Sequence, residues 1–114
     1  MRRGIGVTIG GLIGVALAAS AFAQDTKLVE RGAKLFVDQK CTLCHSMAGK
    51  GNAKGALDEV GSKLSATEIQ QWITSPKEMT EKTKATRKPA MKSFPNLSKE
   101  EVDALVAYLH PTKK

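Results

Sequence analysis

Five consecutive residues, Cys41-Thr42-Leu43-Cys44-His45, hold the side chains of this sequence that are best suited to chemistry. Cysteines three positions apart lie on the same side of a helical turn, so both sulfurs can form thioethers with the two vinyl edges of one porphyrin. His45 follows directly, and its ring can reach beneath that porphyrin to the iron. C-x-x-C-H is the attachment signature of c-type haem. The motif predicts one covalently bound haem c, attached through Cys41 and Cys44, with His45 as an axial iron ligand.

Two other kinds of site can use a C-x-x-C pair. A disulfide or thioredoxin-like site normally lies in a βαβ unit, and no segment of this sequence shows the alternation of a strand. A closed zinc site needs four ligands, and the only histidine besides His45 is His110. The sequence therefore favours haem. For His110 we expect an exposed position at the end of the last helix, with iron ligation as the alternative.

The length and the N-terminal composition predict one domain behind an export signal. The chain has 114 residues and only 4% aromatics, and so short and aliphatic a chain usually needs a cofactor or a staple. Residues 1–23 begin with Arg2 and Arg3, continue without charge and end in an A-x-A cleavage site. An uncleaved anchor is the competing interpretation, because ~20 apolar residues span a bilayer. We expect cleavage, and a mature domain, residues 24–114, that is periplasmic or otherwise exported and has no membrane span.

Three segments of the mature chain show helical periodicity, which predicts an all-α fold. The first helix is expected to end near Lys40, just before the cysteine motif. The second and third helices each follow a capping box, Ser65-x-x-Glu68 and Ser98-x-x-Glu101. They are expected to end before Pro76 and near Leu109. Residues 48–61 and 76–95 lack periodicity and are predicted to be loops.

Several further motifs accompany the cysteine motif and resemble the class I cytochrome c family over nearly the whole mature length. They are Gly32 with Phe36, Val60-Gly61-Ser62-Lys63-Leu64, Trp72-Ile73 with Pro76, Met91-x-x-Phe94, and Leu97-Ser98-x-Glu100-Glu101 leading to Ala107-Tyr108-Leu109. The resemblance implies a small cytochrome c fold, with three main helices wrapped around the haem. It also implies that the first and last helices cross at Gly32, with Phe36 near Tyr108.

The same resemblance implies a second axial ligand and a set of residues around the haem. Met91 is the expected ligand, because Phe94 and Leu97 follow at a spacing that could pack its loop against the ring. Met79 and His110 are its rivals, whereas Met47 would have to pass around the porphyrin edge. Trp72, Phe94, Leu57 and Leu64 are expected to pack on the haem. We also expect His45 Nδ1 to donate to a backbone carbonyl in the loop that contains Gly55-Ala56-Leu57.

The charge is strongly positive and unevenly distributed. The formal net charge is +7, and loss of Arg2 and Arg3 with the signal leaves +5 (7 − 2). We call the clustered basic residues the basic face: Lys77, Lys82, Lys84, Arg87, Lys88, Lys92 and Lys99. The cluster predicts either a solvated surface or a docking surface for acidic patches of redox partner proteins. Nucleic acid binding is disfavoured because an exported protein meets little nucleic acid and Phe94 is the single aromatic residue among these basic residues.

Together these features predict a monohaem c-type cytochrome that carries one electron at a time between redox proteins and has no catalytic residues. We expect a monomer or a subunit of a redox complex. Two alternatives remain open at this stage: the haem subunit of a periplasmic oxidoreductase complex, and a gas-binding haem protein whose sixth iron position is open.

Overall fold

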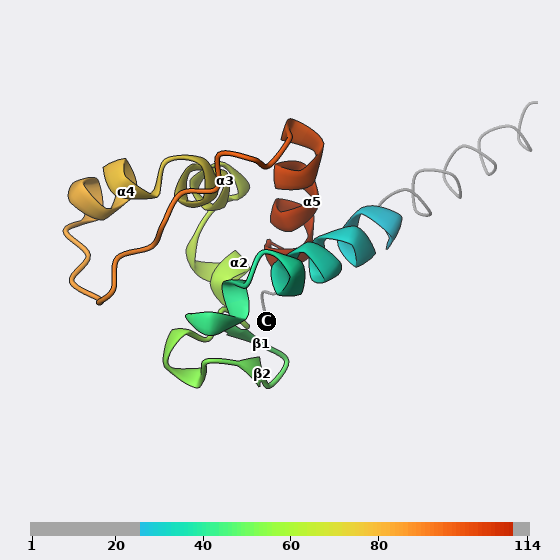
Figure 1. Cartoon of the computed structure of the whole chain (residues 1–114), viewed down its shortest axis with the longest axis horizontal. Helices are drawn as coiled ribbons and strands as arrows, with labels where there is room; N and C mark the ends of the chain where they lie inside the picture. The colour runs from blue at the N-terminus through green and yellow to red at the C-terminus, as the bar shows by residue number, and fades with distance from the viewer. Residues whose placement is uncertain (1–25, 111–114) are drawn as a thin grey trace, which may run out of the picture.

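The computed structural model describes residues 26–110, so the predicted export signal and its cleavage site lie outside the described residues. The described chain is helical with one short hairpin (Figure 1). After a first helix, described over residues 26–38, the elements are η1 (Cys41–Leu43), β1 (Ser46–Met47), β2 (Lys50–Gly51), η2 (Ala53–Gly55), α2 (Val60–Lys63), α3 (Ala66–Thr74), α4 (Pro76–Thr83) and α5 (Lys99–Leu109). The prediction of an all-α class is confirmed.

The first helix crosses α5 at Gly32, as the family resemblance implies (Figure 1). A β-carbon built on Gly32 would overlap the carbonyl oxygen of Ala104 and lie 2.7 Å from Cβ of Tyr108. One turn further on, the rings of Phe36 and Tyr108 have centroids 5.8 Å apart and planes inclined by 60°, a tilted geometry that aromatic pairs favour. The absence of a side chain at Gly32 thus allows the two helices to approach closely.

Capping boxes set the starts of α3 and α5, as predicted. Ser65 Oγ accepts a hydrogen bond from the backbone N–H of Glu68, and Glu68 Oε1 accepts one from the N–H of Ser65. Ser98 and Glu101 repeat this arrangement at α5. The two helices pack together, and their buried faces join the first helix and β1 in one core. Its buried members are Leu35, Phe36, Met47, Ile69, Ile73, Val102, Ala104, Leu105 and Leu109.

The helix α4 corrects the prediction of a loop from Pro76 to Pro95. Pro76 was interpreted only as the stop of the preceding helix, but it also occupies the first turn of α4, where its fixed φ and missing N–H suit a helix start. Glu78 in the first turn and Lys82 in the last complement the helix dipole. Met79 provides the buried contact. The loop prediction holds only for the segment after α4, residues 84–98, which we call the connecting segment.

The region predicted as an irregular loop, residues 48–61, contains short regular elements. β1 and β2 pair antiparallel in the register Ser46 with Gly51 and Met47 with Lys50. Ala48 and Gly49 form the turn with φ of 53° and 84°, which is the sign that two-residue hairpin turns require. Strands of two residues are too short to show alternation in a sequence, and they leave the fold class unchanged.

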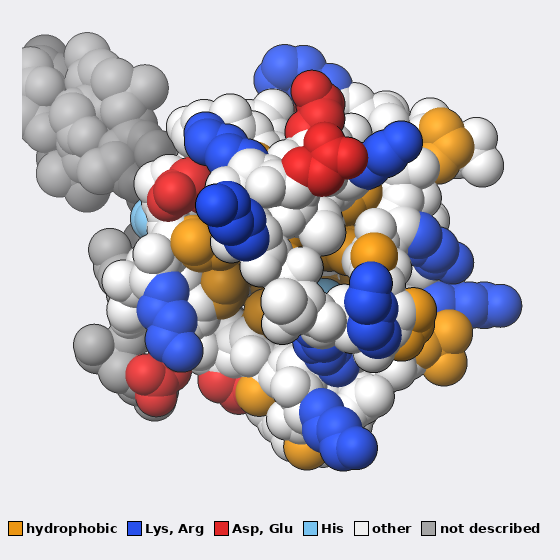
Figure 2. Space-filling view, turned by 90° about the vertical axis from the view of Figure 1, so that its left-hand side faces the viewer, with side chains coloured by type: hydrophobic (Ala, Val, Ile, Leu, Met, Phe, Trp, Pro, Cys, Tyr) orange, Lys and Arg blue, Asp and Glu red, His pale blue; other side chains and the backbone are white. Residues whose placement is uncertain are grey.

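All seven residues of the basic face are exposed. Figure 2 views the molecule from the side of α4, where blue Lys and Arg side chains surround hydrophobic ones and red acidic side chains lie mainly towards the top and the lower left. None of the helices described between residues 26 and 110 is long and apolar enough to cross a membrane.

Candidate haem site

The cysteine motif forms a single tight turn. Lys40 adopts a left-handed conformation with φ of 63° and ends the first helical stretch, and η1 follows at once. The backbone N–H groups of Cys44 and His45 both donate to the carbonyl of Cys41, at 3.1 and 2.8 Å. Both cysteines are half-buried, and no disulfide joins them. The turn therefore places the two cysteines and the histidine on one compact, hydrogen-bonded backbone turn.

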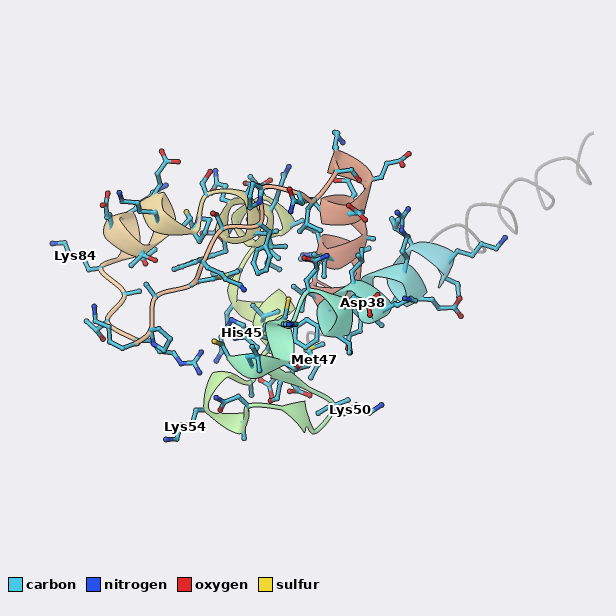
Figure 3. All side chains as sticks on the ribbon, in the orientation of Figure 1. Asp38, His45, Met47, Lys50, Lys54 and Lys84 are labelled. Carbon is cyan, nitrogen blue, oxygen red and sulfur yellow. The ribbon has the colours of Figure 1, made fainter. Side chains whose placement is uncertain are left out.

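The imidazole of His45 is oriented by a backbone carbonyl. Its Nδ1 lies 2.9 Å from the carbonyl oxygen of Gly55, so Nδ1 carries the proton and donates, and Nε2 keeps its lone pair. This is the usual arrangement for a metal-binding histidine. The sequence predicted an acceptor in this loop, and the structure identifies it as Gly55. In Figure 3 His45 lies near the centre of the molecule, whereas Lys54 and Lys84 point outward.

The loop that supplies this carbonyl is held by Asn52, a residue that the sequence analysis missed. The Asn52 N–H approaches the carbonyls of Thr42 and His45 at 3.1 and 3.0 Å. Its side-chain amide donates to the carbonyl of Leu43 at 3.2 Å, and its Oδ1 accepts from the N–H of Lys54 at 3.0 Å. Asn52 thus fastens the loop to the cysteine turn. An asparagine in a glycine-rich stretch was the available signal, because its short amide readily bonds nearby backbone groups.

Burial lowers the pKa of the His45 imidazole below its ordinary value. The hydrogen bond to Gly55 opposes this effect, and the positive charge of Arg87 reinforces it. A lower pKa favours the neutral ring, which is the form that binds a metal ion. The electrostatics of the site therefore suit a ligand histidine.

The connecting segment lies along the cysteine turn. Arg87 Nη2 donates to the carbonyl of Cys44 at 2.7 Å. Burial raises the pKa of the Cys41 thiol, and the positive charge of Lys92, further along the segment, opposes part of this effect. Met91 directly precedes Lys92 and is half-buried. The Arg87 hydrogen bond thus joins the segment that carries the predicted second ligand to the backbone of the cysteine turn.

The other methionines occupy different surroundings. Met47 is buried in the main core, on β1. Met79 is buried within the regular helix α4, where its backbone N–H donates to Ser75 and its carbonyl accepts from Thr83. Met91 lies in backbone that is neither helix nor strand.

The residues expected to pack on the haem divide into two groups. Leu57 and Leu64 are half-buried and pack against the main core. Trp72 and Phe94 are also half-buried, and the ammonium group of Lys92 lies 5.9 Å from the centroid of the Phe94 ring. Each of these four side chains is therefore only partly covered by protein.

His110 departs from the expectation of an exposed position. It caps the C-terminus of α5 and is half-buried. Its backbone packs so tightly on Gly61 of α2 that a β-carbon at Gly61 would overlap the His110 carbonyl. The tight contact with α2 explains why the residue is partly covered.

The arrangement fits a covalently attached haem. Two half-buried thiols share one turn with a histidine whose Nε2 is available, and partly covered apolar side chains are at hand. Helical domains that contain such a turn belong to the class of proteins that attach haem covalently. The chain belongs to the cytochrome c family, whose model matches residues 29–113. It is thus a haem-binding protein of electron transfer, and Cys41 and Cys44 fit the family's attachment motif.

The chain is also similar to cytochrome c oxidase subunit 2 of Alkalihalophilus pseudofirmus. The two are 26% identical over 95 residues, which cover 75% of this chain and 26% of that protein. The chain therefore spans about a quarter of the length of this relative. No solved structure matches the chain.

Proposed function

We propose that this protein is a monohaem electron carrier that passes single electrons between redox proteins and is not an enzyme. Haem iron supplies the one-electron chemistry by alternating between its ferrous and ferric states. The hydrogen bond from His45 Nδ1 to the Gly55 carbonyl is the observation that carries the proposal. It leaves Nε2 as the iron-binding atom and makes the imidazole a stronger donor. Cys41 and Cys44 would hold the porphyrin covalently.

Met91 is the proposed second axial ligand. Its support is the position of the connecting segment, which the hydrogen bond from Arg87 to the Cys44 carbonyl joins to the cysteine turn. A thioether is a weak neutral donor, so its bond to iron depends on packing that holds the loop in place. If His45 and Met91 both held the iron, no position would remain for a substrate, in keeping with a carrier. Methionine ligation also favours a comparatively high reduction potential.

The proposed partners are redox proteins with acidic docking patches. The support is the basic face, which is exposed and located on α4, the connecting segment and the start of α5. Such charges steer encounter over distances of about a Debye length, ~10 Å at 0.1 M salt. Export to the periplasm, after cleavage of residues 1–23, belongs to the same proposal and is based on the signal-like composition of those residues.

A second candidate function is that of a haem subunit in a larger oxidoreductase. The similarity to a cytochrome c oxidase subunit favours it. The two functions differ in their partners: a mobile carrier purifies alone, whereas a subunit co-purifies with a second protein at a fixed ratio. Purification of the native protein without detergent and at low salt, followed by mass measurement of the intact assembly, distinguishes them.

Denaturing mass spectrometry of the exported protein tests the central claim. We expect the mass of the chain from Gln24 plus one haem. Cys41→Ser and Cys44→Ser variants should each lose one covalent link, and the double variant should lose haem on denaturation. A Cys41 to Cys44 disulfide without added haem would contradict the proposal. Rapid carbon monoxide binding by the native reduced protein would instead indicate an open sixth position.

A further inference from the structure

Arg87 differs from the other residues of the basic face in the contact that it makes. Its Nη2 donates a 2.7 Å hydrogen bond to the carbonyl of Cys44, a residue 43 positions earlier in the chain. That carbonyl belongs to the peptide bond between Cys44 and His45. A charged donor on a carbonyl forms one of the stronger hydrogen bonds in proteins. Arg87 therefore binds the backbone immediately before the proposed iron ligand, His45.

The guanidinium of Arg87 also packs on the other backbone segment that orients His45. A β-carbon at Gly55 would overlap both the Cys44 carbonyl oxygen and Arg87 Nη1, and it would lie 2.9 Å from Arg87 Cζ. Gly55 is the residue whose carbonyl accepts the His45 Nδ1 hydrogen bond. The contacts thus form a closed ring of neighbouring residues: Arg87, Cys44, His45 and Gly55.

This arrangement has an orienting consequence and an electrostatic one. Arg87 contacts both backbone segments between which the imidazole is held, so the guanidinium limits rotation of the ring and drift of the loop. The same group brings a permanent positive charge close to the histidine. Positive charge near the iron disfavours its ferric state more than its ferrous state. Because Arg87 is largely exposed, solvent screens part of this effect.

We propose that Arg87 is a positioning residue that fixes His45 through the Cys44 carbonyl and raises the reduction potential of the iron, in addition to any part it has in docking. The inference rests on the proposed function, because it takes His45 as the iron ligand. Neither the C-x-x-C-H motif nor the clustering of basic residues predicts this contact, since it joins segments far apart in the sequence.

Two substitutions separate the orienting effect from the charge. Arg87→Gln removes the charge, and Arg87→Lys keeps it but lacks the planar group that reaches both Cys44 and Gly55. Lys88→Gln is the matched control, because it removes one charge from the neighbouring exposed position of the same segment. For each haem-loaded variant we would measure the equilibrium reduction potential at fixed ionic strength. The ring-proton resonances of His45 in the ferric protein, observed by NMR, would report its orientation.

We expect Arg87→Gln to lower the potential more than Lys88→Gln does and to shift the His45 resonances. Arg87→Lys should have a reduction potential close to that of the wild type and should still shift the His45 resonances. Lys88→Gln should leave those resonances in place. If Arg87→Gln and Lys88→Gln changed the reduction potential equally and left the His45 resonances unmoved, the positioning role of Arg87 would be overturned. The proposed function would stand. A wild-type protein without haem would overturn the proposed function and this inference with it.

Discussion

Gly32 and Ala104 are in direct backbone contact where the first helix crosses α5, with no room for a side chain between them. The contact brings Phe36 and Tyr108 together on the same pair of helices. The crossing thus joins the N-terminal and C-terminal helices of the described chain.

Gly32→Ala should destabilise the protein, although alanine is the better helix former by about 1 kcal/mol. Its new methyl group would overlap the Ala104 carbonyl and crowd Tyr108, and such overpacking typically costs about 1–3 kcal/mol. We therefore expect a net loss of unfolding free energy, which denaturant titration of the haem-loaded protein would measure. Glu30→Ala, at an exposed position of the same helix, is the control and should change stability little. A Gly32→Ala protein as stable as wild type would contradict the requirement for glycine at this crossing.

Ser98→Ala should weaken the start of α5. The variant removes the hydroxyl that accepts from the Glu101 N–H, and loss of such a cap costs about 0.5–2 kcal/mol. Ser98→Asp preserves an acceptor at the same position and should retain most of the stability. Thermal unfolding of both variants, followed by circular dichroism, provides the comparison. Equal melting temperatures for the two variants would count against a capping role.

Met91→Ala should abolish the weak long-wavelength absorption band that methionine ligation gives to ferric haem, and it should lower the reduction potential. Met79→Ala should leave both nearly unchanged, while its cavity in the buried face of α4 costs about 2–5 kcal/mol of stability. Visible spectra and redox titrations of the two variants are the measurements. The opposite pattern would transfer the ligand role to Met79, and loss in neither variant would return attention to His110.

Electron exchange with an acidic redox partner should slow as salt is added. The basic face is exposed, and its long-range attraction is screened once the Debye length falls to ~10 Å at 0.1 M ionic strength. Stopped-flow second-order rates over a range of salt concentrations would measure the slope. Replacing Lys77 and Lys82 of α4 with glutamine should flatten that slope, whereas Lys50→Gln, on the hairpin, should change it less. A second-order rate that does not change with salt concentration would indicate that the basic face is only a solvated surface.

Local signals in the sequence were sufficient for much of the fold. Ser65 and Ser98 each lie three residues before their glutamates, so both capping boxes could be predicted without knowledge of tertiary structure. The C-x-x-C-H turn is equally local, since its hydrogen bonds link residues within one turn. Pro76 misled the prediction because proline stops one helix and starts another with equal ease. The second role is shown by the position of Pro76 in the first turn of α4.

The parts of the site that escaped prediction depend on how separate segments meet. The identity of the His45 acceptor follows from the folding of residues 46–55, in which Asn52 takes part in five hydrogen bonds. No periodicity in the sequence predicts that backbone path. In the sequence, nothing distinguishes Arg87 from the other residues of the basic face. Its contact with Cys44 depends on the route of the connecting segment, for which the sequence offers prolines but no repeating pattern.

The loop anchored by Asn52 also has a consequence for the order of assembly. His45, the carbonyl that orients it and the asparagine that fastens both lie within a stretch of chain from Cys41 to Leu57, and β1 bonds to Leu57 at its end. Loops of about ten residues close in roughly 10–100 ns, far faster than whole domains fold. The hydrogen-bonded backbone around His45 is therefore local enough to close before distant segments dock, and the Arg87 contact, 43 positions away from Cys44, would complete the positioning of the imidazole afterwards.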